Sequence, residues 1–209
     1  MDQPLLSPEQ VSWGTEPAER ADAARNRRLL LATAREMLAA DGVDKLTMDG
    51  LAERAGLGKG TVFRRFGTRA GIFRALLDDA ERSFQELVLT GPPPLGPGAP
   101  PLDRLVAYGR ARIGFLIEHR DIARATLDGS EPIPAGSRTP MSQLHIRVLL
   151  GQMDIGPADL DMLAVQLSAA LDGPLLLYLS ADDLAEPAPR TAERIARAWH
   201  DLIRRACRP

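Results

Sequence analysis

The chain has 209 residues, 44% of them hydrophobic, so it is long enough to bury a core and to form one or two domains. Its single cysteine, Cys207, excludes an intrachain disulfide and fits a reducing, cytoplasmic location. The sequence has no run of 18 apolar residues and no signal-type segment, so we expect neither membrane insertion nor secretion. Residues 20–75 carry 12 Lys and Arg against six Asp and Glu, whereas the remainder carries 14 against 22. A basic N-terminal module joined to an acidic body predicts an anionic partner at one end of the chain.

The first segments in chain order are an arm and a helix. Residues 1–22 contain three Pro and show no period, so we expect a mobile arm, followed by a helical domain over residues 23–70. The first predicted helix carries Leu30, Ala34, Met37 and Leu38 on one side. It should end at Asp41-Gly42, because glycine tolerates the backbone that stops a helix.

The next stretch, TMDGLAERAGLGKGTVFRRFGTR, predicts two short helices joined by a tight turn. Thr47 can cap the first helix, and Gly56 supplies the left-handed residue at its end. Leu57 then holds the second helix against the first. The second helix, Lys59 to Phe66, turns Val62 and Phe66 inward. The residues left available to a partner are Lys59, Gly60, Thr61, Arg64 and Arg65.

Such a face of small and cationic residues suits the major groove of DNA, where small residues allow close approach and Arg or Lys contacts guanine or phosphate. One alternative is a basic face that is merely solvated. Another is a Gly-rich phosphate loop over residues 56–61, which would bind a nucleotide. The phosphate loop is disfavoured because such loops follow a buried strand, whereas this segment follows an amphipathic helix.

From Leu30 to Leu76 the sequence resembles the DNA-binding domain of the TetR family of bacterial transcription regulators. The resemblance lies in AADGVDKLTMDGLAERAGLGKGTVFRRFGTRAGIF. It implies that residues of the second short helix and its flanks, together with the helix cap Thr47, bind DNA. The residues are Thr47, Gly58, Lys59, Gly60, Thr61, Phe63, Arg64, Arg65 and Arg69. In this pattern Arg69 is the cation that holds a phosphate. Asp49 departs from it, because a carboxylate there would repel phosphate unless a cation meets it.

The remaining chain predicts further helices and no strands. Helical spacing covers residues 69–89, 102–119, 121–127, 141–152, 158–179 and 191–206, with Pro- and Gly-rich breaks at TGPPPLGPGAPP and GSEPIPAGSRTP. Gly173-Pro174 predicts a kink. The fold class is therefore all-α: an N-terminal three-helix helix-turn-helix domain, followed by a helical ligand-binding and dimerisation domain over residues 71–209.

The last two predicted helices carry more apolar surface than one flank of a small domain needs. The resemblance implies that they form a four-helix interface with a second copy, giving a homodimer. The predicted interface residues are Leu163, Leu167, Leu171, Ile195, Trp199 and Ile203. The alternative is that the same residues form an ordinary core within one chain.

The resemblance also implies an inducer site in the body, between residues 102 and 166. Polar, aromatic and pliable residues occur there within apolar helices: Tyr108, Arg112, Phe115, Arg124, Met141, His145, Met162 and Gln166. They predict a mainly apolar pocket with a few polar anchors. Ligand binding would release the operator through the helix that begins at Arg69, acting as a lever. The alternative is a DNA-binding protein with no such pocket.

Catalytic signals are weak. The three histidines, His119, His145 and His200, show no metal-binding spacing, and the sequence has no nucleophile elbow. We therefore predict no enzyme activity, cofactor or metal. The predicted function is that of a sequence-specific regulator, of the repressor type, that binds an operator in double-stranded DNA and responds to a small molecule.

Overall fold

The computed structural model describes residues 16–126, 141–179 and 188–207. These residues form helices and no strands, which confirms the predicted all-α fold. The chain divides into two compact units between Arg69 and Ala70. The predicted break over residues 129–140 lies outside the described residues, as do residues 1–15 of the predicted arm. None of the described helices has the length and apolarity that crossing a membrane requires.

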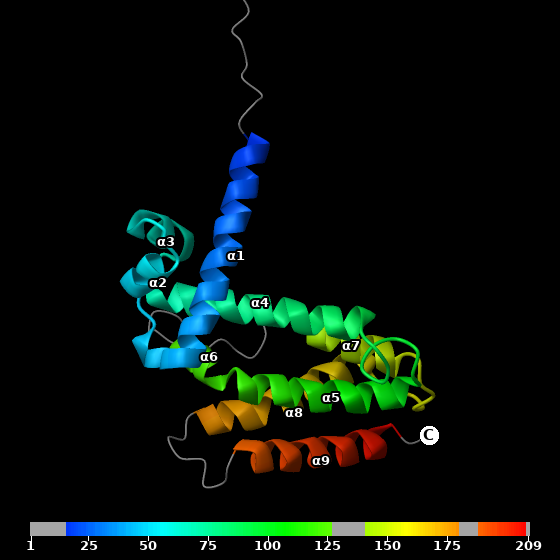
Figure 1. The fold of residues 1–209 in the computed structure, drawn as a ribbon. Coiled ribbons are helices and arrows are strands. Elements are labelled where there is room, and N and C mark those ends of the chain that lie inside the picture. The colour runs from blue at the N-terminus through cyan, green and yellow to red at the C-terminus, as the bar shows by residue number, and fades with distance from the viewer. Residues whose placement is uncertain (1–15, 127–140, 180–187, 208–209) are drawn as a thin grey trace, which may run out of the picture. The chain divides into compact units, whose positions relative to one another are not determined.

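The first unit contains, in chain order (Figure 1), the long helix α1 (Glu16–Asp41), the 3₁₀ turn η1 (Val43–Lys45), and the short helices α2 (Met48–Arg54) and α3 (Lys59–Phe66). The helix α1 starts within the predicted arm, so residues 16–22 are helical rather than irregular. The run EPAERADAAR explains this difference, because Ala, Glu and Arg are strong helix formers and its one Pro lies in the first turn. The helix ends at Asp41, before Gly42 with φ of 80°, as predicted.

Local backbone chemistry sets the angle between α2 and α3. The Thr47 hydroxyl accepts a hydrogen bond of 3.0 Å from the backbone N–H of Gly50 and caps α2. At the other end Gly56 has φ of 65°, its N–H bonds to the Glu53 carbonyl, and the Leu57 N–H bonds to the Ala52 carbonyl. This pair of bonds is the Schellman arrangement that ends a helix at a left-handed glycine. The chain is thereby redirected into α3 within four residues of the end of α2.

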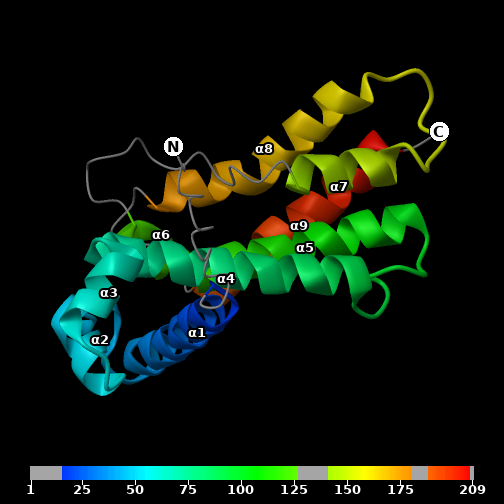
Figure 2. The same cartoon turned by 90° about the horizontal axis from the view of Figure 1, so that it is seen from above.

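The second unit is a layered bundle of helices (Figures 1 and 2). Its elements are α4 (Arg69–Thr90), α5 (Pro101–Glu118), α6 (Arg120–Ala125), α7 (Met141–Leu150), α8 (Leu160–Leu179) and α9 (Ala188–Ala206). Helix α5 packs along α9, and α7 packs along α8. Helix α8 remains helical through Gly173-Pro174, where the sequence predicts a kink.

The core of the second unit is centred on α5. The Trp199 indole of α9 lies against α5 and donates a hydrogen bond of 3.1 Å to the Leu105 carbonyl. It occupies the space beside Gly109, where any Cβ would overlap the ring. Leu105 and Ile203 are fully buried in the same cluster. The glycine therefore allows α5 and α9 to approach closely, which a larger residue at position 109 would prevent.

Candidate functional site

The outer face of α3 is the first candidate site. Val62 and Phe66 are buried at 0% and 9% exposure, so the helix is fixed with its other side in solvent, as predicted. A Cβ on Gly58 or Gly60 would meet no atom within 4 Å, so the backbone there is open to close approach. We name the outward residues the recognition face: Lys59, Gly60, Thr61, Phe63 and Arg64. Within it the Phe63 side chain is 50% exposed, so its ring is open to a partner.

An ion pair links the recognition face to α2. The Lys59 ammonium lies 2.9 Å from the Asp49 carboxylate, and both side chains are more than half exposed. The sequence indicated that Asp49 needs a cation if it lies near phosphate, and Lys59 is that cation. The pair lowers the net positive charge at the start of α3, where N–H groups that lack helical partners already favour an anion.

Two of the predicted DNA-contacting arginines form bonds within their own unit. The Arg65 guanidinium donates a hydrogen bond of 2.6 Å to the Ala23 carbonyl in α1. Arg69 is half-buried, and its guanidinium donates hydrogen bonds of 2.7 Å to the Leu46 carbonyl and 2.6 Å to the Val43 carbonyl. The expectation that Arg69 serves as a phosphate clamp is therefore revised: its guanidinium ties the η1 segment to the start of α4. The Thr47 hydroxyl likewise serves as the α2 cap.

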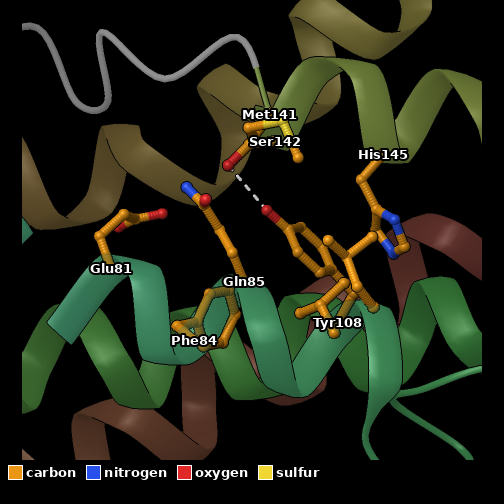
Figure 3. A pocket seen from close by; sticks show the side chains of 9 residues that line it. Glu81, Phe84, Gln85, Tyr108, Met141, Ser142 and His145 are labelled. Atoms are coloured by element: carbon orange, nitrogen blue, oxygen red, sulfur yellow. Dashed lines mark hydrogen bonds between the residues drawn. The ribbon is translucent and has the colours of Figure 1, made fainter. Parts of the chain in front are cut away.

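The second candidate site is a pocket in the second unit between α4, α5 and α7 (Figure 3). Its cavity volume is about 20 Å³, and the hollow reaches about 290 Å³ only when the space open to solvent is counted. The residues that line it are Glu81, Phe84, Gln85, Val88, Leu89, Tyr108, Met141, Ser142 and His145. In Figure 3 the labelled side chains of α4 and α7 face one another, with Tyr108 of α5 between them.

Hydrogen bonds order the polar part of this wall. The Tyr108 hydroxyl donates a hydrogen bond of 2.7 Å to the Ser142 hydroxyl. Behind the wall, the buried Arg112 donates a hydrogen bond of 2.6 Å to the Glu81 carboxylate. Its guanidinium carbon lies 5.6 Å from the centre of the Phe84 ring and 5.0 Å from that of Phe115. A buried guanidinium is tolerated only because a carboxylate and two aromatic faces surround it.

Burial decides the charge state of the titratable groups in the wall. It lowers the pKa of His145 to about 4, with a smaller contribution from the positive charge of Arg104. Burial also raises the pKa of Tyr108, which the bond to Ser142 only partly offsets. Both side chains are therefore neutral near pH 7, and Glu81 is the only Asp or Glu of the lining.

The structure brings together only some of the predicted ligand residues. Tyr108, Met141 and His145 line the pocket, and Arg112 and Phe115 lie directly behind it. Arg124 on α6, and Met162 and Gln166 on α8, are exposed and lie outside this lining, so a role for them in ligand binding stays a prediction. The predicted ligand segment began at residue 102, so it did not include α4, which forms one wall of the pocket. The signal was present in Glu81 and Gln85, two polar residues on either side of Phe84 in an apolar stripe.

The predicted dimer residues require a partial correction. Leu167, Leu171, Trp199 and Ile203 are at most 3% exposed within a single chain. Leu163 and Ile195 are partly buried against the same core. The first four are therefore covered by their own chain and stabilise the domain itself, whereas a place for Leu163 and Ile195 in a dimer contact stays a prediction. The large apolar side chains that α8 and α9 expose are Met162, Val165 and Leu202.

Comparisons with known proteins agree with the helix-turn-helix geometry. Residues 30–76 match the family model described as "Bacterial regulatory proteins, tetR family". A curated relative, the "DNA-binding transcriptional repressor TetR" of Mycobacteroides abscessus, is 39% identical over 59 residues. Residues 30–76 are therefore similar to the DNA-binding segment of the TetR family. That match spans 28% of this chain and 31% of the relative, about a third of the relative's length.

Solved TetR-family structures share the fold over nearly the whole chain. A regulator from Pectobacterium atrosepticum has a TM-score of 0.67 at 19% identity, covering 91% of this chain and 98% of that one. One from Rhodococcus sp. has a TM-score of 0.60 at 18% identity, covering 88% and 100%. One from Mesorhizobium loti has a TM-score of 0.57 at 18% identity, covering 87% and 96%. At these identities the likeness concerns the fold.

Proposed function

We propose that this chain is a sequence-specific DNA-binding transcriptional regulator of the TetR family and of the repressor type, acting on double-stranded DNA in the cytoplasm. The observation that supports it best is the recognition face of α3. Buried Val62 and Phe66 fix the helix, while Lys59, Gly60 and Arg64 remain exposed. A helix of this kind reads base edges in the major groove while nearby cations and backbone N–H groups hold phosphates.

The chemistry of the face suggests separate roles for its members. Open glycines at positions 58 and 60 let the start of α3 approach the DNA backbone. Arg64 is exposed one turn later, and its planar fork suits the two acceptors of a guanine. The exposed Phe63 offers an apolar contact to a thymine methyl group.

The test is selection of a duplex from a pool of random sequences, followed by titration of the full chain with the selected duplex and a scrambled one. We expect the selected duplex to bind at least about a thousandfold more tightly, the lower end for specific DNA-binding proteins. Equal affinity for both duplexes at every salt concentration would reject sequence-specific binding.

The proposal includes a homodimer, because two-fold operators need two recognition helices about one helical turn of DNA apart. Its contact would be formed by the outer faces of α8 and α9, where exposed small and apolar residues recur at helical spacing. These residues are Met162, Val165, Ala169, Ala198 and Leu202. Covering them removes apolar surface that a lone chain leaves in water.

The proposal also includes release of DNA by a small molecule bound in the α4–α5–α7 pocket. Helix α4 supports it, because the one continuous helix begins at Arg69 in the first unit and carries Glu81, Phe84 and Gln85 in the pocket wall. A ligand can release DNA only by favouring a conformation that binds DNA less tightly. The competing proposal is a DNA-binding protein without ligand response. A compound that raises the melting temperature yet leaves operator affinity unchanged would favour the competitor.

A further inference from the structure

The wall of the α4–α5–α7 pocket carries a single acidic side chain. Of the nine residues that line it, Glu81 is the only Asp or Glu, and burial keeps His145 neutral near pH 7. Its carboxylate already accepts a 2.6 Å hydrogen bond from Arg112, whose side chain is 3% exposed. No lysine or arginine belongs to the described lining. An anionic ligand would therefore leave water without gaining a cation in contact, which is costly.

The charges in and behind the wall do not supply the missing attraction. Arg112 and Arg104 are the two cations whose fields reach Tyr108 and His145, respectively. Glu81 and Asp172 are the two carboxylates whose fields reach Tyr108. Of these carboxylates, Glu81 is bonded to Arg112, and burial raises the pKa of Asp172. The surroundings thus favour an uncharged ligand over a carboxylate or a phosphate.

One polar atom of the wall lacks a partner. The Nε2 atom of His145 is buried and makes no hydrogen bond in the described part of the chain. The neighbouring hydroxyls of Tyr108 and Ser142 bond to each other (Figure 3). A buried polar atom without a hydrogen bond is costly, so a ligand that supplies one gains affinity. A hydroxyl fits best, because it can donate to or accept from either neutral tautomer of the imidazole.

The rest of the wall is aromatic and aliphatic. The rings of Tyr108 and His145 lie 4.9 Å apart, and those of Phe84 and Tyr108 lie 5.9 Å apart. Val88, Leu89 and Met141 complete the lining. Rings in this arrangement favour an aromatic guest by edge and face contacts.

From these observations we infer that the pocket takes an uncharged aromatic molecule bearing a hydroxyl group, which bonds to His145, and that it discriminates against carboxylates. The inference names the ligand class for the ligand-responsive regulator proposed above, and its biological role rests on that proposal. The binding itself does not depend on DNA.

The experiment uses three bicyclic probes of similar size with the full chain, without DNA: 2-naphthol, naphthalene and 2-naphthoate. Affinities are measured by calorimetry at pH 7, where 2-naphthol is neutral and 2-naphthoate is charged. We expect 2-naphthol to bind the most tightly, because it alone has the hydroxyl without the charge. His145→Phe keeps a ring but removes the nitrogen, so it should weaken 2-naphthol by roughly five- to tenfold, about the value of one hydrogen bond, and leave naphthalene unchanged.

The matched control is Gln143→Ala, which alters an exposed residue of α7 outside the lining and should change none of the three affinities. Circular dichroism of both variants checks that they fold. Absence of 2-naphthol binding, 2-naphthoate binding at least as tightly, or a His145→Phe loss shared by naphthalene would each overturn the inference. Failure of the regulator proposal is recognised separately, by equal affinity for selected and scrambled DNA.

Discussion

Lys59, the first residue of α3, forms a 2.9 Å ion pair with Asp49 of α2, which places a carboxylate beside the proposed DNA surface. An exposed pair of this kind contributes at most about 1 kcal/mol to folding. It matters more for binding, because each cation that a protein brings to a phosphate releases a counterion. A DNA phosphate can therefore compete with Asp49 for the Lys59 ammonium.

The first prediction follows from that pair. Asp49→Asn should strengthen binding to selected and scrambled duplexes alike and steepen the salt dependence by up to about one unit of slope, since Lys59 becomes available to a phosphate. Titrations at several salt concentrations measure both. Glu36→Gln, at an exposed site on α1, controls for the change in net charge. Tighter binding only to the selected duplex would mean that Asp49 or Lys59 acts on bases instead.

The second prediction concerns Arg69. Arg69→Ala should lower the free energy of unfolding by about 2–4 kcal/mol, because two charged hydrogen bonds to the Val43 and Leu46 carbonyls are lost. Denaturant titration followed by circular dichroism provides the measurement. Arg82→Ala, which removes an exposed arginine from the same helix, should cost much less. An unfolding curve for Arg69→Ala that matches the wild type would return Arg69 to the role of a phosphate clamp.

The third prediction tests the packing of α5 on α9. Gly109→Ala should destabilise the chain by about 1–3 kcal/mol, because the new methyl group overlaps the Trp199 indole. Gly114→Ala lies in the same helix with nothing within 4 Å, so it should stabilise by up to about 1 kcal/mol through helix propensity. The two melting temperatures should therefore move in opposite directions. A shift of the same sign in both variants would show that the Trp199 contact is not maintained.

The fourth prediction separates a dimer surface from the core. Val165→Arg changes a side chain that is 42% exposed on α8, so it should yield folded monomers in sedimentation experiments. Leu167→Arg, at a position 3% exposed, should unfold the domain instead. Leu144→Arg on α7 is the control, because that leucine is 50% exposed but lies on neither α8 nor α9. A dimer that persists in Val165→Arg at micromolar concentration would exclude the proposed surface.

Local signals in the sequence predicted the first unit closely. Thr47 predicts the N-terminal cap of α2, and Gly56 predicts where that helix ends. The spacing of Val62 and Phe66 predicts the buried side of α3. Each of these signals depends on residues within one or two turns, so sequence reasoning can detect it.

Long-range partners could not be predicted in the same way. Arg69 was expected to face phosphate, but it bonds to carbonyls 23 and 26 residues earlier, and no local pattern reveals such a contact. The helical spacing of Trp199 and Ile203 correctly predicted that one face of α9 is buried. Periodicity alone does not say whether that face is buried by the same chain or by a second copy.

The central claim is that the outer face of α3 reads a DNA sequence, and Arg64→Ala tests it most directly. The measurement is the affinity of wild type, Arg64→Ala and Arg197→Ala for the selected and scrambled duplexes at one fixed salt concentration. Arg197 is an exposed arginine on α9, so its replacement changes the charge equally but leaves α3 intact. We predict that Arg64→Ala loses about 1–3 kcal/mol on the selected duplex and much less on the scrambled one, because a guanine contact exists only in the selected sequence. Equal losses on both duplexes, or a loss no greater than that of Arg197→Ala, would contradict the claim.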